Sequence, residues 1–206
     1  MPKIVDHDQR REQLAEAAWR IIRRDGLEGV SVRRVAEEAG MSLGSLRHYF
    51  VTQSELLAFS MRLVSERVTK RMKGMALSGD PRTDMETIIG ELVPLDEERL
   101  AECEVWLAFT GNSLAHPKLR LLSDEVHDSL FAFFRHIVDS AIELKLAKPG
   151  IDPKLEAMRL HALVDGLVVH GVMRPELVKP DDITRIVTYH LDALMAQKKE
   201  SGLETQ

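Results

Sequence analysis

The sequence predicts an all-α protein, with an N-terminal unit of three helices followed by a larger helical bundle, about nine helices in total. Three observations lead to this fold class. Apolar residues recur at helical spacing along the whole chain, whereas no segment shows the strict alternation of a strand. Prolines and glycines lie between the periodic segments, where helices begin and end. The composition, 44% hydrophobic and 30% charged, is typical of a folded globular protein.

The first expected helix covers about residues 8–25 and has one apolar face. Apolar residues recur there at the i, i+3, i+4, i+7 and i+8 positions of an amphipathic helix. They are Leu14, Ala17, Ala18, Ile21 and Ile22. Gly26 follows at the position where a helix commonly ends.

Two short helices are expected next. Ser31 can cap the first, and Gly40 can end it in the left-handed conformation. Ser42 can cap the second, in which Leu46 and Phe50 lie four residues apart on one buried face.

The remaining helices are longer, and their expected limits lie near prolines and glycines. They are expected at about 53–73, 83–93, 95–115, 117–147, 152–173 and 180–198. A polar tail, residues 199–206, follows.

Charge divides the chain unevenly. Residues 1–75 contain 14 Lys and Arg against 10 Asp and Glu, a balance of +4, whereas residues 76–206 contain 14 against 23, a balance of −9. The sum is the overall charge of −5. This asymmetry indicates an N-terminal part that can face a polyanion and an acidic remainder.

The two short helices, joined by residues 39–42 and preceded by a longer helix, match a helix-turn-helix in spacing and turn chemistry. If Leu46 and Phe50 face the core, the rest of the second helix can enter a major groove. Arg47 can then donate to guanine or phosphate, and Tyr49 to a backbone oxygen. The free N–H groups at the two helix N-termini make Ser31 and Ser42 neighbours of phosphates. Any single arginine here can equally be an ordinary solvated charge.

Residues 30–42, together with Gly44-Ser45-Leu46 and His48-Tyr49-Phe50, closely resemble the N-terminal signature of TetR-family regulators. The resemblance implies a homodimer that binds a palindromic double-stranded DNA operator and usually represses until a small-molecule effector enters the larger domain. By matching positions, it implies base contacts from Arg33, Leu43, Gly44, Ser45 and Arg47, and phosphate contacts from Ser31, Ser45, His48 and Tyr49. Family members usually have a lysine where this chain has Gln53, so the salt dependence of operator binding should be shallower.

A narrower resemblance, to the BetI-like branch, involves the segments 45–50, 53–57, 92–99 and 164–167. That branch includes regulators of choline-to-betaine metabolism, but the likeness does not fix the effector. The expected domains are a helix-turn-helix domain at 1–52, a connecting helix and linker at 53–80, and a ligand-binding and dimerisation domain at 81–198.

The last two helices have long apolar stripes that favour a four-helix interface with a second copy of the chain. The residues predicted for this interface are Leu160, Val164, Leu167, Val168, Ile183, Ile186, Val187, His190, Leu191 and Leu194. Complete burial within one protomer is the alternative.

A ligand pocket is expected among the central helices. Its candidate residues are Met85, Trp106, Phe109, Thr110, His127, Phe131, Phe134, Met158, His161 and Asp165. Trp106 is the strongest candidate, because an indole can pack against a hydrophobe or face a quaternary cation. The alternative is that most of these side chains belong to the ordinary core.

Other functions have weaker support. Residues 40–44 match the G-x-S-x-G pattern of hydrolases, but a helix rather than a strand precedes Ser42, so an N-cap is favoured. The eight histidines form no metal-binding spacing, and no pattern indicates a cofactor or a catalytic residue. Redox sensing by Cys103, or a helical adaptor that never contacts DNA, remain alternatives. The single cysteine and the lack of an apolar leader or membrane-spanning stretch predict a cytoplasmic protein.

Overall fold

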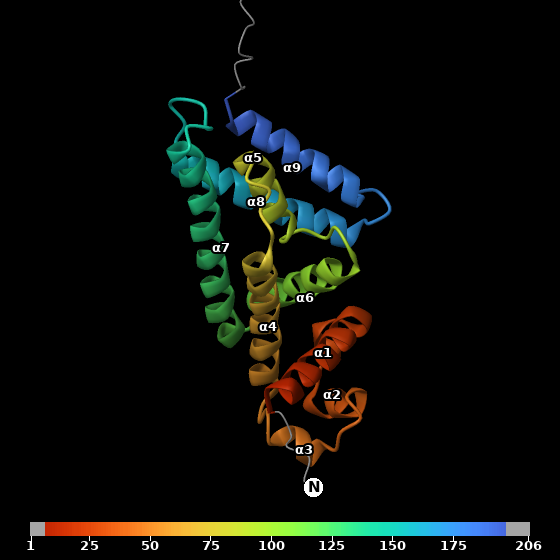
Figure 1. Ribbon diagram of the computed structural model, residues 1–206. Helices are drawn as coiled ribbons and strands as arrows, with labels where there is room; N and C mark the ends of the chain where they lie inside the picture. The colour runs from red at the N-terminus through yellow and green to blue at the C-terminus, as the bar shows by residue number, and fades with distance from the viewer. Residues whose placement is uncertain (1–6, 197–206) are drawn as a thin grey trace, which may run out of the picture.

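The computed structural model describes residues 7–196, which form nine α-helices and one short 3-10 turn (Figure 1). The elements are α1 His7–Asp25, the 3-10 turn η1 Leu27–Gly29, α2 Val32–Glu38, α3 Leu43–Arg47, α4 Gln53–Gly74, α5 Pro81–Gly90, α6 Glu97–Ser113, α7 Pro117–Glu143, α8 Pro153–Met173 and α9 Pro180–Leu194. An isolated bridge joins Ala147 to Met195, and this range contains no other strand pairing. The all-α prediction is confirmed. No helix in the described range is sufficiently long and apolar to span a membrane.

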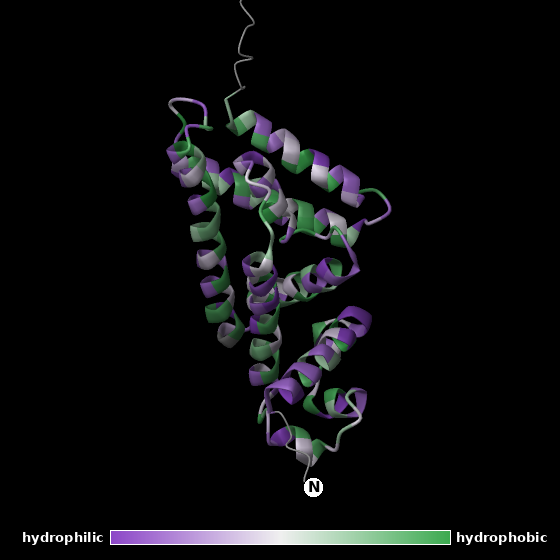
Figure 2. Ribbon diagram, viewed as in Figure 1, coloured by the Kyte–Doolittle hydropathy of each residue, from purple (hydrophilic) through white to green (hydrophobic). Residues whose placement is uncertain are grey.

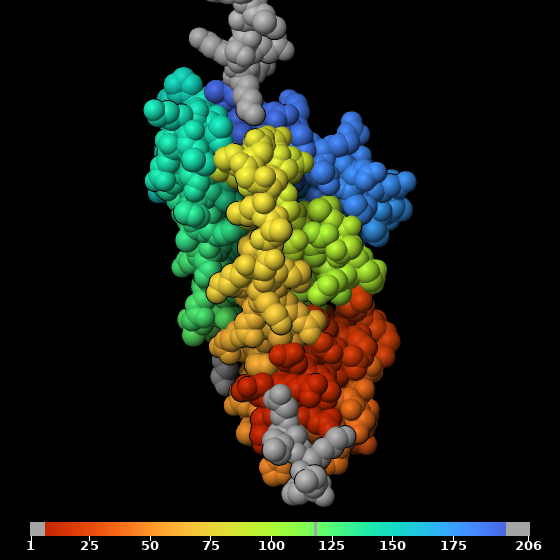
Figure 3. Space-filling view, in the orientation of Figure 1, coloured from red at the N-terminus to blue at the C-terminus, as the bar shows by residue number. Residues whose placement is uncertain are grey.

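The first three helices form one end of the molecule, called here the head (α1–α3), and α5–α9 form the body (Figure 1). Helix α4 runs from the head into the body along the front of the space-filling view, between α7 and α6 (Figure 3). Helix α6 also contacts both parts, since it packs against α1 and α4 as well as α7 and α8. Two helices therefore connect the head to the body.

The predicted helix caps are confirmed in the head. The Ser31 hydroxyl accepts a hydrogen bond from the backbone N–H of Arg34 at 3.2 Å, and that of Ser42 accepts one from Ser45 at 3.1 Å. Gly40 ends α2 with a φ of 65°, a conformation that L side chains rarely adopt. Each side-chain cap stabilises its helix by about 1 kcal/mol. These caps fix where α2 and α3 begin, and so fix the turn between them.

Several helices end earlier than periodicity predicts. Helix α7 stops at Glu143 and α9 at Leu194, because the segment after α7 pairs with the segment after α9. The Lys148 N–H donates to Leu194 O at 3.0 Å, and the Ala196 N–H donates to Leu146 O at 2.7 Å. Residues 197–198 of the predicted last helix, and the tail at 199–206, lie outside the described residues.

The first two body helices are also shifted from their predicted limits. Helix α5 spans Pro81–Gly90 rather than 83–93, because Asp80 caps it and accepts a hydrogen bond from the Thr83 N–H at 3.0 Å. Helix α6 starts at Glu97, where Asp96 accepts a hydrogen bond from the Arg99 N–H at 2.8 Å. In both cases a capping carboxylate, rather than the apolar pattern, sets the first residue.

Two hydrophobic clusters fill the molecule. The first joins the head to the N-terminal half of α4 and also includes Val105, Phe109, Leu119 and Leu122 of the body. The second lies among α5–α9. Trp106 packs against both clusters. Because close-packed side chains resist independent displacement, the orientation of the head is fixed by its contact with the body. In Figure 2, α1 and α9 alternate between hydrophilic and hydrophobic segments, as surface helices do.

Candidate DNA-binding interface and ligand cavity

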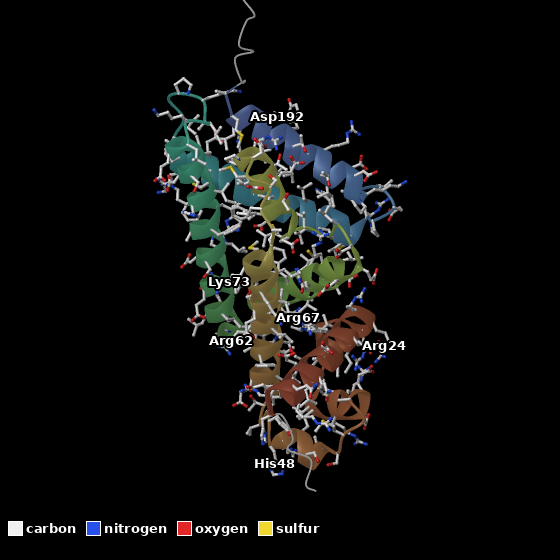
Figure 4. All side chains as sticks on the ribbon, in the orientation of Figure 1. Arg24, His48, Arg62, Arg67, Lys73 and Asp192 are labelled. Carbon is white, nitrogen blue, oxygen red and sulfur yellow. The ribbon has the colours of Figure 1, made fainter. Side chains whose placement is uncertain are left out.

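Helix α3 presents one side to the core and the other to solvent. Leu46 and Phe50 are buried in the first cluster, whereas Ser45, Arg47 and His48 are exposed. His48 lies at the tip of the head, furthest from the body (Figure 4). Phe50 packs against Phe59 of α4 with 5.3 Å between ring centroids, so the second end of the helix is anchored to α4. The predicted outward surface is therefore brought together on a helix whose inner side is fixed.

Two hydroxyls lie at the N-terminus of α3. Those of Ser42 and Ser45 are 2.9 Å apart, and both residues are exposed. Ser31 occupies the same capping position on α2. A cap hydroxyl that accepts from the backbone can still donate outward, which suits contact with a phosphate oxygen. The cap geometry, preceded by α2 rather than by a strand, is not that of a nucleophile elbow at Ser42.

No contact within the protein requires a glycine at position 44. A Cβ at this position would meet only the Ser42 hydroxyl, 3.9 Å away, and the residue is exposed. Its helical backbone would accept alanine, which has the higher helix propensity. The absence of a side chain is instead what close approach by another molecule would require.

The arginines of the head differ in how they are paired. Arg33 bonds Glu37 at 3.0 Å on the surface, and Arg34 bonds Asp25 and, at 2.8 Å, Gly29 O. Arg24 pairs with Asp25 and Glu38. Arg47, by contrast, makes no side-chain hydrogen bond or ion pair within residues 7–196. Among these cations it is the one whose charge is not already balanced by a neighbour.

The two other predicted contacts near α3 are partly engaged by the protein. The Tyr49 ring is half-buried, and its centroid lies 5.6 Å from that of His7. The Gln53 amide donates to Val30 O at 2.8 Å. Gln53 therefore links the start of α4 to the residue before the N-cap of α2. Sequence reasoning missed this contact, and also the capping box in which Thr52 accepts from the Glu55 N–H at 3.1 Å.

Arg23 connects the head to the body. It donates to Glu97 at 2.9 Å and also to Glu104, both on α6. Hydrogen bonding to Glu97, and secondarily to Glu104, raises the pKa of Arg23. This guanidinium is therefore engaged by two carboxylates of the body.

A cavity of about 440 Å³ lies between α4, α6, α7 and α8. This volume is within the range of small-molecule sites. Its walls are formed by Met61, Arg62, Val64, Ser65, Val68, Thr69, Met72, Glu91, Leu92, Arg99, Glu102, Cys103, Trp106, Leu122, Glu125, Val126, Ser129, Leu130, Phe133, Val164, Asp165 and Val168. Helix α4 forms one complete wall, so the helix that carries the head also borders the cavity.

The predicted pocket residues are divided by the structure. Trp106 and Asp165 line the cavity. The others do not: Met85, Phe109 and Phe134 are buried in the core, Thr110 and Phe131 are half-buried elsewhere, and Met158 is 52% exposed. The residues missed are mainly those of α4, where Met61, Val68 and Met72 continue the apolar stripe beyond the head. The length of the apolar stripe on α4 was the sequence feature that could have predicted these cavity residues.

The remaining two predicted pocket residues, His127 and His161, stack on each other beside the cavity. Their ring centroids are 4.7 Å apart, and His161 also lies 5.0 Å from the Phe134 ring. The Nε2 atom of His161 is 3.7 Å from the Asp165 carboxylate. Burial lowers the pKa of His161 and raises the pKa of Asp165. Both shifts disfavour the charged form of the residue concerned.

Four charged residues close one end of the cavity region. The Arg71 guanidinium donates to both carboxylate oxygens of Glu102, at 2.8 and 2.6 Å, and to Glu91 at 2.7 Å. Arg99 also bonds Glu91, at 3.2 Å. Hydrogen bonding to Glu102 is the main cause that raises the pKa of Arg71. The group ties the C-terminal part of α4 to α5 and α6.

Cys103 lines the cavity as a buried thiol. Burial raises the pKa of Cys103 to about 12, with the carboxylates of Glu102 and Glu104 adding to the effect. The thiolate is the form that reacts with oxidants, and it is scarce at neutral pH. This environment does not favour the redox-sensor interpretation.

The predicted dimer stripe faces inward. Leu160, Val164, Leu167, Val168, Ile183, Val187, His190, Leu191 and Leu194 are all buried within the protomer. Ile186 alone of the predicted set is exposed. The stripes of α8 and α9 pack against α5–α7 and each other, so their assignment to a contact between copies is corrected. Periodicity had identified buried faces but not the neighbour that buries them.

Comparisons with known proteins agree with this architecture. Residues 14–59 match the model of bacterial regulatory proteins of the tetR family, and residues 81–196 match that of the BetI-type transcriptional repressor C-terminal domain. The chain is 45% identical over 207 residues to the HTH-type transcriptional regulator PksA of Bacillus subtilis, covering 100% of this chain and 98% of that protein.

Solved structures show the same fold. A transcriptional regulator from Rhodococcus sp. Rha1 superposes with a TM-score of 0.78 at 28% identity, over 89% of this chain and 95% of that one. A putative transcriptional regulator from Saccharomonospora viridis, solved in complex with choline, gives a TM-score of 0.78 at 21% identity over 92% and 100%. The chain therefore belongs to the TetR family of bacterial transcriptional regulators, with a helix-turn-helix DNA-binding domain and a C-terminal domain of the BetI type.

Proposed function

We propose that the protein is a homodimeric repressor that binds a palindromic operator in the bacterial cytoplasm and releases it when a small molecule occupies the cavity. The observation that carries the DNA part is the exposed side of α3. Arg47, which has no side-chain partner among residues 7–196, lies there on a helix anchored by Leu46 and Phe50. An arginine with no internal partner can form a bidentate contact with guanine without first breaking an ion pair. Gly44, on the same surface, leaves room for the groove edge.

Replacing Arg47 with alanine should weaken operator binding by about 1–3 kcal/mol for each half-site, or roughly fivefold to 150-fold per half-site. Fluorescence anisotropy with a duplex selected by the native protein would measure the change in affinity. Because Arg47 is exposed, its replacement should leave the melting temperature of the protein unaltered. Arg24→Ala is the matched control, since Arg24 is an exposed head arginine that is already paired with Asp25 and Glu38. Equal affinities for native protein and Arg47→Ala would contradict the interface. Failure of the native protein to retain any duplex would favour the adaptor alternative.

The dimer is proposed to use the outer sides of α8 and α9. Each keeps an exposed apolar residue pair three positions apart, namely Leu155 and Met158 on α8 and Ile186 and Tyr189 on α9. Tyr189 is 78% exposed, and aromatic side chains at interface centres contribute strongly to association. Ile186 and Tyr189 also line a surface hollow, together with Asp182, Arg185, Thr188 and Asp192. These residues replace the buried stripe that the sequence had suggested.

A charge placed at Tyr189 should separate the protomers. In a two-fold interface Tyr189→Glu introduces the charge twice, so sedimentation velocity should show a shift from the dimer toward the 23.3 kDa protomer. Leu144→Glu is the control, because Leu144 is an exposed leucine in the turn after α7. A dimer that survives Tyr189→Glu but not Leu144→Glu would place the interface elsewhere.

The response to a ligand is proposed to pass through α6. Glu97 and Glu104 lie two turns apart on one side of this helix, where both hold Arg23 of the head. Cys103 and Trp106, on the other side, line the cavity. A ligand that displaces α6 would therefore alter the bonds from Arg23 to Glu97 and Glu104, and with them the orientation of α3. The choline complex of the Saccharomonospora viridis protein supports a ligand site in this fold.

A further inference from the structure

The cavity wall is mainly apolar in area, and the carboxylates that line it are not equivalent. Glu102 is 3% exposed and is fully engaged by the Arg71 guanidinium. Glu91 is shared by Arg71 and Arg99. Both charges are thus compensated within the protein, and a ligand could bind them only by displacing a guanidinium.

Asp165 differs from these two carboxylates. Within the described residues it has no Lys or Arg partner, and the titratable groups that act on it are His161, 3.7 Å away, and His127. The 3.7 Å distance is too long for a hydrogen bond, and burial lowers the pKa of His161, which disfavours its cationic form. Burial also raises the pKa of Asp165, as expected for a carboxylate whose charge is poorly compensated. A cation in the cavity would remove this deficit.

The surroundings of Asp165 suit a cation carried on an apolar molecule. Trp106 and Phe133 line the same cavity, and aromatic rings attract cations that have left water. The volume of about 440 Å³ exceeds what a lone ammonium headgroup needs, and valines and methionines cover much of the wall. The other free charges of the lining, Arg62 on α4 and Glu125 on α7, are solvent-exposed, so water screens them. The Asp165 side chain is partly buried, with 38% of its surface exposed. Figure 4 shows Arg62 on the α7 side of α4.

We propose that the effector is an amphipathic monocation, an ammonium or substituted ammonium on an extended apolar body, whose charge is bound by the carboxylate of Asp165. The proposal rests on the cavity being the effector site of the proposed function. It assigns recognition of charge to one residue of α8, and recognition of shape to the apolar walls from α4, α6 and α7.

Three probes with the same chain and different headgroups test this: octylammonium, 1-octanol and octanoate. An alkylammonium stays protonated at pH 7, as lysine does with a pKa of about 10.4. Isothermal titration of the full-length protein should give a Kd for octylammonium at least about tenfold below that for 1-octanol, with octanoate the weakest. In Asp165→Asn the preference for octylammonium over 1-octanol should shrink to within about twofold, while the Kd for 1-octanol stays the same. Glu125→Gln, which removes the exposed carboxylate, should keep the native preference.

Every other outcome contradicts a specific part of the proposal. Equal binding of octylammonium and 1-octanol by the native protein, or a preference that survives Asp165→Asn, would refute the role of Asp165 while leaving the cavity as a ligand site. Loss of the preference for octylammonium in Glu125→Gln would assign recognition of the cation to Glu125 instead of Asp165. If none of the probes binds, the effector assignment of the cavity fails with the proposal. Operator retention by the same preparation then reports separately on the DNA-binding function. The native comparison needs no variant to fold.

Discussion

Arg71→Met should lower the free energy of unfolding by about 3 kcal/mol, toward the lower end of the range for breaking a buried ion pair. The loss arises because Glu102, 3% exposed, would keep a buried charge with no guanidinium to bind both of its oxygens. Typical domains are stable by about 5–15 kcal/mol, so the change should be evident in urea denaturation. Arg71 itself is partly exposed and lies outside the cavity lining, so the effect reports on the ion pair.

The double variant Arg71→Met/Glu102→Leu separates the ion pair from packing. Removing both partners eliminates the uncompensated carboxylate, and we expect at least half of the lost stability to return. Glu91 keeps Arg99 as a partner in both variants, at 3.2 Å. A double variant less stable than Arg71→Met would show that the ion pair contributes mainly through the contacts of its side chains rather than through charge compensation.

Phe50→Ala should cost about 3–5 kcal/mol, the usual range for emptying a buried phenylalanine site. Phe50 is fully buried, and its ring lies 5.3 Å from both the Phe59 centroid and the Arg11 guanidinium carbon. The cavity would open directly behind α3, so operator affinity should fall even at temperatures where the protein remains folded. Urea denaturation and anisotropy measure the two effects.

The adjacent residue provides the control for this substitution. Val51 is 72% exposed, so its side chain buries little surface, and Val51→Ala should change the free energy of unfolding by less than about 0.5 kcal/mol. Intact operator binding in folded Phe50→Ala would show that α3 keeps its orientation without the aromatic anchor. Comparable losses in both variants would mean that the effect does not come from burial.

The head was largely predictable from the sequence because its structure is specified by local chemistry. Ser31, Gly40 and Ser42 act through their own backbones and near neighbours, so their positions alone predict the turn between α2 and α3. Leu46 and Phe50 are buried on the face that their spacing indicates. Gln53 is the exception, because its bond to Val30 O joins residues distant in the sequence and leaves no local pattern.

The body was less predictable because its site depends on how helices are placed around a space. Apolar spacing predicted that Val164 and Ile183 are buried, but it could not distinguish burial inside the protomer from burial against a second copy. Likewise, Phe134 and Met72 are both apolar residues of helices, yet only Met72 lines the cavity. A cavity is a region left unfilled by several helices, and no single helix records it. The sequence also could not predict which carboxylates are paired with a cation, since the contrast between Glu102 and Asp165 depends on Arg71 from another helix.

The position of α6 between Arg23 and the cavity has a thermodynamic consequence under the proposed response. Coupling between two binding sites is reciprocal, so an effector that weakens operator binding by some factor must bind the operator complex more weakly by the same factor. Regulator that is free in the cell would then take up effector at lower concentrations than regulator already on its operator. The promoter would therefore respond only after the unbound pool is filled, and its threshold would rise with the amount of regulator present.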